Sequence, residues 1–202
     1  TNWQSPGDIV MITACVRDLH RAHPGQFETA IVTSCPALWE HNPHAAHFPE
    51  PWLHLEAAHA RDGKYGGLAP GEESHPKIVE RDDVTIIPML YPTVNNSNQR
   101  PGHFIGAFHE YLAGVLHVPI PVSEFKGDIH LSAGEREWMS QVAGMGVHTP
   151  YWLIETGGKW DYTAKWFNPW TLQQVVNRCD RIVWVQFGDK GNWRPELRNT
   201  IN

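Results

Sequence analysis

Apolar residues recur at helical spacing in two long stretches of the chain. Positions three and four apart are apolar through residues 9–22, and this run stops before Pro24. The same spacing extends through residues 103–116 and stops before Pro119. Because proline cannot continue a helix, each stretch predicts one amphipathic helix with a defined end.

Shorter apolar runs have the composition of strands. They are rich in β-branched residues and are bounded by glycine, proline or charged residues. These runs lie at residues 28–34, 78–80, 84–90, 151–155 and 181–187. The run at 28–34 predicts a buried parallel strand, because it is continuously apolar between its polar ends. A short helix is expected directly after it, over residues 35–40.

Two local signals place helices in the second half of the chain. Ser132 and Glu135 form a capping-box pattern, which predicts a helix to about residue 145. Asn168 followed by Pro169 predicts a second start, because proline is favoured at the first helical position; this helix is expected to end near residue 178.

The second of these helices lies between the runs at 151–155 and 181–187, so the order is that of a βαβ unit. We therefore predict an α/β fold with two Rossmann-like domains. The first covers residues 1–118 and the second residues 148–202, with a connector and its helix at 119–147.

Composition excludes some classes of protein. The 202 residues include 22 acidic and 16 basic side chains, a net charge of −6, so no basic surface for nucleic acid is expected. No apolar run approaches the roughly 18 residues that a membrane-spanning helix needs. We expect a cytoplasmic protein with at most peripheral membrane association. The three cysteines, Cys15, Cys35 and Cys179, lack CxxC spacing and are expected to be free thiols.

The junction of loop and helix at Pro6, Gly7 and Asp8 carries the first candidate site. Pro6 fixes φ, Gly7 accepts any φ, and a carboxylate at a helix start can cap the backbone N–H groups there. The same place can hold a catalytic base or a phosphate group. Capping and chemistry both remain open readings for Asp8.

A second candidate site follows the run at 151–155. Thr156, Gly157 and Gly158 let backbone N–H groups approach an anion, and Thr163 and Lys165 add a hydroxyl and a positive charge. These residues could bind a diphosphate. The open alternative is an ordinary turn, since neither GxxxxGK[ST] nor GxGxxG occurs in the chain.

Two segments resemble glycosyltransferase family 9, the ADP-heptose:lipopolysaccharide heptosyltransferase-like enzymes. SPGDIVMITACVRDLHRAHPG looks like the N-terminal segment of that family, in which a Gly-Asp pair opens the first helix. ETGGKWDYTAKWFNPWTLQQVVNRC, followed by RIVWVQFGD, is similar to the start of its C-terminal domain. The resemblance covers about half of the chain and implies the GT-B fold.

The resemblance also implies an activity, the inverting transfer of a heptose-like sugar from a nucleotide-diphosphate donor to a saccharide, lipid-linked or protein acceptor. It assigns the base to Asp8 and phosphate binding to Thr163 and Lys165, and transfer by these groups invokes no metal or other cofactor. Only Thr1–Gln4 precede the junction, and the chain ends soon after residue 187, so the first strand is expected to be missing and the second domain incomplete. An inactive transferase fragment is an alternative.

Histidine is used unusually often, with 13 residues in the chain. Five of them fall close together, at His41, His44, His47, His54 and His59. Their spacing permits a zinc site, and hence a histidine-rich metal-binding module without transferase activity; a solvated loop is the other interpretation. His103 and His109 lie on the helix expected at 103–116. Both, with Asn98 in the preceding loop, are candidates for acceptor contact, against local capping or packing.

Overall fold

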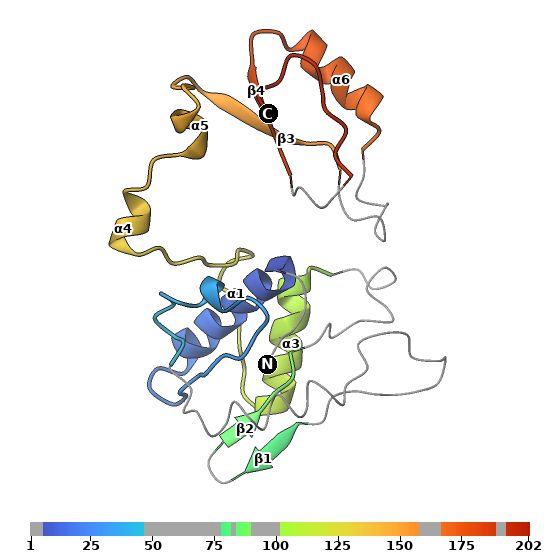
Figure 1. The fold of residues 1–202 in the computed structure, drawn as a ribbon. Helices are drawn as coiled ribbons and strands as arrows, with labels where there is room; N and C mark the ends of the chain where they lie inside the picture. The colour runs from blue at the N-terminus through green and yellow to red at the C-terminus, as the bar shows by residue number, and fades with distance from the viewer. Residues whose placement is uncertain (1–5, 47–77, 82–83, 90–101, 158–166, 189–192) are drawn as a thin grey trace. The chain divides into compact units, whose positions relative to one another are not determined.

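The structure is a computed structural model that describes residues 6–46, 78–81, 84–89, 102–157, 167–188 and 193–202. It divides into two compact units, Thr1–Arg136 and Glu137–Asn202, which we describe separately (Figure 1). Among the described residues, the first unit holds a pair of long helices and a short hairpin, and the second holds a small parallel sheet with one longer and one short helix. The fold is therefore α/β.

The first helix, α1, spans Pro6–Ala22 and confirms the helix expected at 9–22. It begins three residues earlier than expected, because Pro6 lacks the N–H that a first helical residue leaves unbonded. Asp8 consequently lies inside the first turn and is not the N-cap residue. The apolar stripe of α1 is buried as predicted, with Ile9 at 1% exposure and Leu19 at 4%.

The second long helix, α3, spans Phe104–Leu116 and confirms the prediction at 103–116. His103 is its N-cap, and the Nδ1 atom of that ring accepts a hydrogen bond from the Ile105 N–H at 3.2 Å. His117 ends the helix in the left-handed conformation, at φ 54°. Helices α1 and α3 pack side by side around Phe108, which is fully buried (Figure 1).

The strands expected at 78–80 and 84–90 are present, the second of them shorter than expected. β1 (Val79–Arg81) and β2 (Val84–Ile86) pair as an antiparallel hairpin, whereas a Rossmann-like domain has a parallel sheet. The run at 28–34 is not a strand but makes an isolated parallel bridge between Ala30 and Ala46. A strand needs a neighbour along its length, and within the described residues this run has only isolated bridges, at Ala30 and Thr33, in place of a continuous pairing. The expected short helix at 35–40 is the 3-10 turn η1, Pro36–Leu38.

The second unit confirms the predicted βαβ order. β3 (Tyr151–Glu155) and β4 (Val183–Phe187) are parallel and in register, Tyr151 opposite Val183 and Glu155 opposite Phe187. Between them lies α6, Pro169–Arg178, whose N-cap Asn168 accepts a hydrogen bond from the Trp170 N–H at 2.9 Å. A small core lies beneath α6, where its buried side chain, Val176, packs against side chains from both strands and from the C-terminal segment. It consists of Ile154, Val176, Trp184 and Leu197.

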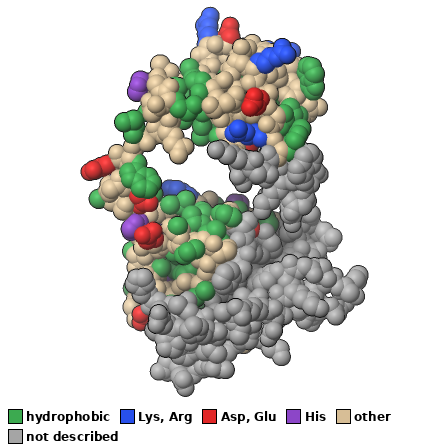
Figure 2. Space-filling model, in the orientation of Figure 1, with side chains coloured by type: hydrophobic (Ala, Val, Ile, Leu, Met, Phe, Trp, Pro, Cys, Tyr) green, Lys and Arg blue, Asp and Glu red, His purple; other side chains and the backbone are tan. Residues whose placement is uncertain are grey.

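The helix predicted for residues 132–145 is broken in two. The capping box is present, since the Glu135 N–H donates to Ser132 Oγ at 3.1 Å and the Ser132 N–H donates to Glu135 Oε2 at 2.8 Å. However, α4 ends at Arg136 after four residues (Ala133–Arg136), and α5 covers only Gln141–Gly144. Trp138 and Met139 between them are each 75% exposed. Figure 2 shows that hydrophobic side chains also lie on the surface of the described residues. A short helix without a buried face is marginal in water, so the interruption follows from the lack of packing.

The boundary between the units falls inside the predicted connector at 119–147. Residues 119–136 belong to the first unit, where Ile120 is buried in the core with Phe108. Within the described residues, none of the helices combines the length and the hydropathy that a membrane crossing requires. Cys15, Cys35 and Cys179 are free thiols, as expected.

Chymotrypsin should cut the native chain after Trp138 or Met139 faster than after Trp184, because these exposed residues directly follow the boundary between the two units. Trp184 is the matched control, since it is 7% exposed in the core of the second unit. Mass spectrometry of products at short digestion times locates the cuts. Equal cleavage rates at Trp138 and Trp184 would contradict the assignment of an exposed boundary.

Candidate functional site

Asp8 lies in the first turn of α1 and is 9% exposed. Carboxylates are favoured at this end of a helix, because the unbonded N–H groups there carry partial positive charge. A Cβ added to the preceding Gly7 would meet no atom of the described residues within 4 Å. Packing within the described part of the chain therefore does not explain the glycine.

A buried polar network lies ten residues further along the same helix, around Asp18. The Asp18 side chain is 1% exposed and receives hydrogen bonds from three directions. Ser123 donates its hydroxyl to Oδ1 at 2.5 Å and its N–H to Oδ2 at 3.0 Å. Arg17 Nε donates to Oδ1 at 3.0 Å, and His109 Nε2 lies 2.9 Å from Oδ2. One carboxylate thus joins α1, α3 and the segment after α3.

His109 completes this network from α3. Its Nδ1 atom lies 2.7 Å from the Ile105 carbonyl oxygen, while Nε2 faces Asp18. Both ring nitrogens face oxygen atoms, so the ring is held at both of its nitrogens. His109 is 3% exposed and pairs with Asp18. Packing therefore explains the position of His109, and this is the alternative to acceptor contact that the sequence left open.

The order of these groups differs from that of a nucleophilic triad. In such a triad the serine hydroxyl bonds to the histidine ring, which a carboxylate orients from the other side. Here the Ser123 hydroxyl bonds to Asp18, and the second nitrogen of His109 is taken by a backbone carbonyl. The network therefore holds helices together and activates no serine.

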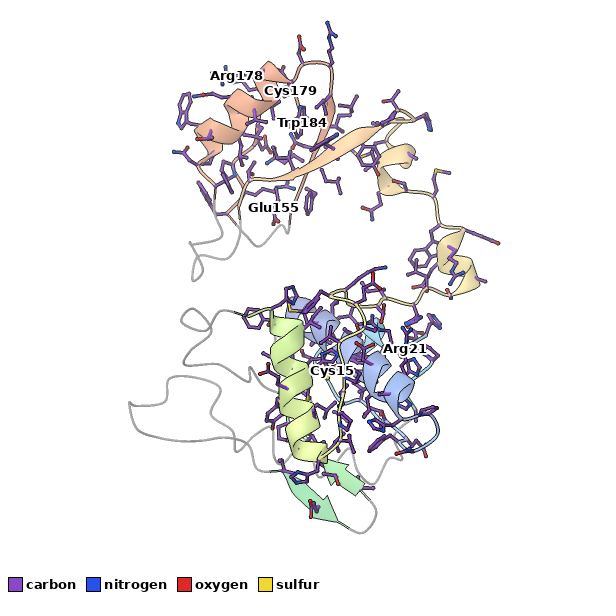
Figure 3. The ribbon with its side chains drawn as sticks, turned by 180° about the vertical axis from the view of Figure 1, so that it is seen from behind. Cys15, Arg21, Glu155, Arg178, Cys179 and Trp184 are labelled. Carbon is purple, nitrogen blue, oxygen red and sulfur yellow. The ribbon has the colours of Figure 1, made fainter. Side chains whose placement is uncertain are left out.

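Electrostatics around Asp18 agree with that role. Burial raises the pKa of the Asp18 carboxyl, but hydrogen bonds from Arg17, Ser123 and His109 outweigh it and hold the pKa well below its usual range. Burial, with a contribution from the Asp18 charge, raises the pKa of the nearby Cys15 thiol to about 12. Cys15 lies in the helix pair, with Sγ 3.6 Å from the Phe108 carbonyl oxygen (Figure 3). Its thiol is neutral and does not serve as a nucleophile.

His41 and His44, the two histidines of the proposed zinc site that the structure describes, have local partners. His41 Nε2 lies 3.4 Å from Glu135 Oε2. His44 stacks on His20 with ring centroids 4.9 Å apart, and burial followed by the His44 charge lowers the pKa of His20. Among the described residues, no group of three or more histidine, cysteine or acidic side chains could hold a metal ion. The other candidates, His47, His54 and His59, lie outside them.

In the second unit, Thr156 and Gly157 are held by the C-terminal segment. Thr156 is fully buried; its hydroxyl donates to the Pro195 carbonyl at 2.7 Å and accepts from Gln186 Nε2 at 2.8 Å. A Cβ on Gly157 would overlap the Trp193 carbonyl oxygen. Both residues are thus explained by packing, the alternative that the sequence left open.

Of the remaining candidate residues, one has a structural role and the others lie outside the described residues. His103 caps α3, which is its local alternative to acceptor contact. Asn98, Gly158, Thr163 and Lys165 lie outside the described residues. Sequence reasoning missed Arg17, Asp18 and Ser123. The available signal was an Arg-Asp pair inside an otherwise apolar helical stripe, where a charged residue needs a buried partner.

Comparisons of the chain with protein-family models, with curated proteins and with solved structures give no match.

Replacing Asp18 by Asn should lower the free energy of unfolding by about 3–5 kcal/mol at neutral pH, because Arg17 loses its counter-charge and His109 and Ser123 lose a buried carboxylate partner. The folded-state pKa of Asp18 lies below its unfolded value of about 3.9. Its stabilisation is therefore complete above about pH 5 and is lost as the pH falls through about 4 towards the folded-state pKa.

Urea unfolding at a series of pH values tests this prediction. Between about pH 5 and pH 3 the wild type should lose stability more steeply than Asp18→Asn. Asp180→Asn, at an exposed position, is the control and should follow the wild type. Parallel curves for the wild type and Asp18→Asn would show that Asp18 is not the group responsible.

Thr156→Val should destabilise the protein by about 1–3 kcal/mol, since Gln186 and the Pro195 carbonyl lose a buried partner. Thr156→Ser keeps the hydroxyl and is the matched control. Equal urea midpoints for the Val and Ser variants would refute a structural role for the Thr156 hydroxyl.

Gly157→Ala should lower the free energy of unfolding by about 1–3 kcal/mol, because the new methyl group meets the Trp193 carbonyl.

Proposed function

We propose that this protein is an inverting glycosyltransferase with two Rossmann-like domains of the GT-B type. It transfers a heptose-like sugar from a nucleotide-diphosphate donor to a saccharide, lipid-linked or protein acceptor in the cytoplasm. The proposal goes beyond the α/β fold described above, and it rests on the resemblance of two segments to glycosyltransferase family 9.

The observation that carries the proposal is the placement of Asp8. It is an acidic residue in the first turn of a long, well-packed helix. A general base needs a carboxylate held in one position with access for the hydroxyl that it deprotonates. The buried stripe of α1 and its contacts with α3 supply the fixed position. We expect the acceptor hydroxyl to approach Asp8 from the side of Gly7, where a Cβ would meet no atom of the described residues within 4 Å.

In the proposed reaction Asp8 takes the proton of the acceptor hydroxyl while that oxygen attacks the anomeric carbon of the donor. The bond from this carbon to the diphosphate oxygen breaks, and the diphosphate leaves with the electron pair. Attack from the face opposite the leaving group inverts the configuration. Charge that develops on the leaving oxygen requires N–H groups or cations around it, each contributing about 3 kcal/mol when well placed.

We assign the donor to the second unit. The support is its parallel βαβ arrangement, because ligands of α/β sheets bind beyond the carboxyl ends of the strands. The loop between β3 and α6 follows such an end and contains the candidate ligands Gly158, Thr163 and Lys165. Thr156 and Gly157, which precede this loop in the sequence, are themselves fixed by contacts with residues 193–195.

The first experiment measures donor binding. Melting temperatures are compared with and without millimolar ADP, UDP and GDP, and with an ADP-sugar. A ligand that binds only the folded state, present at a concentration a hundred times its dissociation constant, stabilises that state by about 2.7 kcal/mol. A melting curve resolves a stabilisation of this size. Lys165→Ala should abolish the shift, whereas Lys126→Ala, on an exposed residue of the first unit, should keep it. No shift with any nucleotide would count against the proposal.

The second experiment tests the base. Asp8→Asn should reduce the release of nucleoside diphosphate from an ADP-sugar and a saccharide acceptor by at least about 10²-fold, because the amide cannot take the proton. The nucleotide-induced melting shift should persist. Asp180→Asn is the control with the same chemical change at an exposed site. Wild-type turnover by Asp8→Asn would leave Asp8 as a structural residue only.

A further inference from the structure

Residues 123–128, which we call the strap, lie against α1 with an unusual density of polar contacts. The strap follows Ile120, which is buried in the core of the first unit, and it precedes α4. Its residues contact α1 in reverse order, from Ser123 at Asp18 to Gly127 at Val10. The strap thus runs from the second half of α1 back towards the turn that carries Asp8.

Arg17 is the centre of these contacts. Its Nη1 donates to the Lys126 carbonyl at 2.9 Å and to Asp128 Oδ2 at 2.8 Å, and its Nη2 donates to the Glu124 carbonyl at 3.1 Å. Nε and Nη2 also bond to the Asp18 carboxylate. A guanidinium group can bind two carboxylates and two carbonyls at once because its donors point in fixed directions within one plane. The side chain is 17% exposed, so it is largely withdrawn from water.

A second group of contacts joins the strap to the turn of Asp8. The Asp128 N–H donates to Thr13 Oγ1 at 2.7 Å, and the Thr13 hydroxyl in turn donates to the Val10 carbonyl at 2.6 Å. A Cβ on Gly127 would overlap that same carbonyl oxygen, so only glycine allows the strap to approach so closely. Two hydrogen bonds in series therefore connect the strap to a residue two positions from Asp8.

We propose that Arg17 is a positioning residue, which clamps the strap onto α1 and thereby fixes the first turn of the helix with Asp8. The clamp has a charged half, formed by Arg17 with Asp18 and Asp128, and a neutral half, formed by Thr13 with the Asp128 N–H. Asp18 orients the guanidinium from the helix side, and His109 and Ser123 orient Asp18. The consequence for reaction rate rests on the proposed function; the consequence for the order of the first turn does not.

The first test is hydrogen exchange, which needs no activity. Arg17→Ala should speed exchange of the strap amides at least tenfold, and exchange of amides at residues 8–13 should rise with it, because the strap no longer holds that turn. Arg21→Ala is the matched control: it removes the same charge from the same helix at an exposed position (Figure 3). Unchanged exchange in the strap, or a loosened strap over an unchanged first turn, overturns the proposal.

Two further variants keep the test valid if Arg17→Ala does not fold. Thr13→Val preserves the shape of a fully buried side chain and removes only its hydroxyl. It should speed exchange of the Asp128 amide and of the turn at residues 8–13. Arg17→Lys keeps the charge but loses the planar set of donors, so its exchange should resemble that of Arg17→Ala. If both variants exchange like the wild type, the clamp does not position the turn.

Activity separates this inference from the proposed function. If Asp8 is the base, Thr13→Val and Arg17→Lys should lower kcat several-fold and leave KM for the donor unchanged, since the donor is assigned to the other unit. If Asp8→Asn retains full turnover while both variants loosen residues 8–13, the proposed function fails and the clamp stands. If Asp8→Asn is inactive but both variants keep the wild-type kcat, the clamp does not serve catalysis and the positioning role is wrong.

Discussion

The first unit depends on one buried carboxylate. Asp18 is almost completely withdrawn from water, and an ionised group in that position is tolerated only when it is paired and fully hydrogen-bonded. Arg17, His109 and Ser123 meet that requirement from three separate segments of the chain. Satisfying one carboxylate therefore fixes α3 and the strap relative to α1, with a geometry that apolar packing alone would leave less defined.

Apolar packing and this polar network have different roles. The core around Phe108 excludes water and supplies most of the driving force for pairing α1 with α3, because burial of apolar area is non-directional and roughly additive. Hydrogen bonds to Asp18 add direction. They set which turn of α1 lies next to which residue of the strap, and so they determine how the first turn, with Asp8, is held.

The second unit uses a neutral version of the same arrangement. Gln186 on β4 donates to both the Thr156 hydroxyl and the Pro195 carbonyl, and its own carbonyl accepts from the Leu197 N–H at 2.8 Å. Thr156 itself bonds to Pro195. One buried amide thus attaches the C-terminal segment to the ends of β3 and β4, beside the loop where the donor site is proposed.

The sequence by itself determined what depends on neighbours along the chain. The Asn168 cap, the Ser132 capping box, the periodic helices α1 and α3, and the βαβ order were all predictable, because their signals lie within a few residues of each other. Only the tertiary structure decided the rest. The helix after Ser132 stops because Trp138 and Met139 find no surface to cover, and the run at 28–34 lacks a partner strand among the described residues. Arg17 and Asp18 read as ordinary helix charges until Ser123 and His109, about a hundred residues away, are brought against them. Burial and long-range hydrogen bonds determine the role of a charged side chain, and both depend on residues that are distant from it in the sequence.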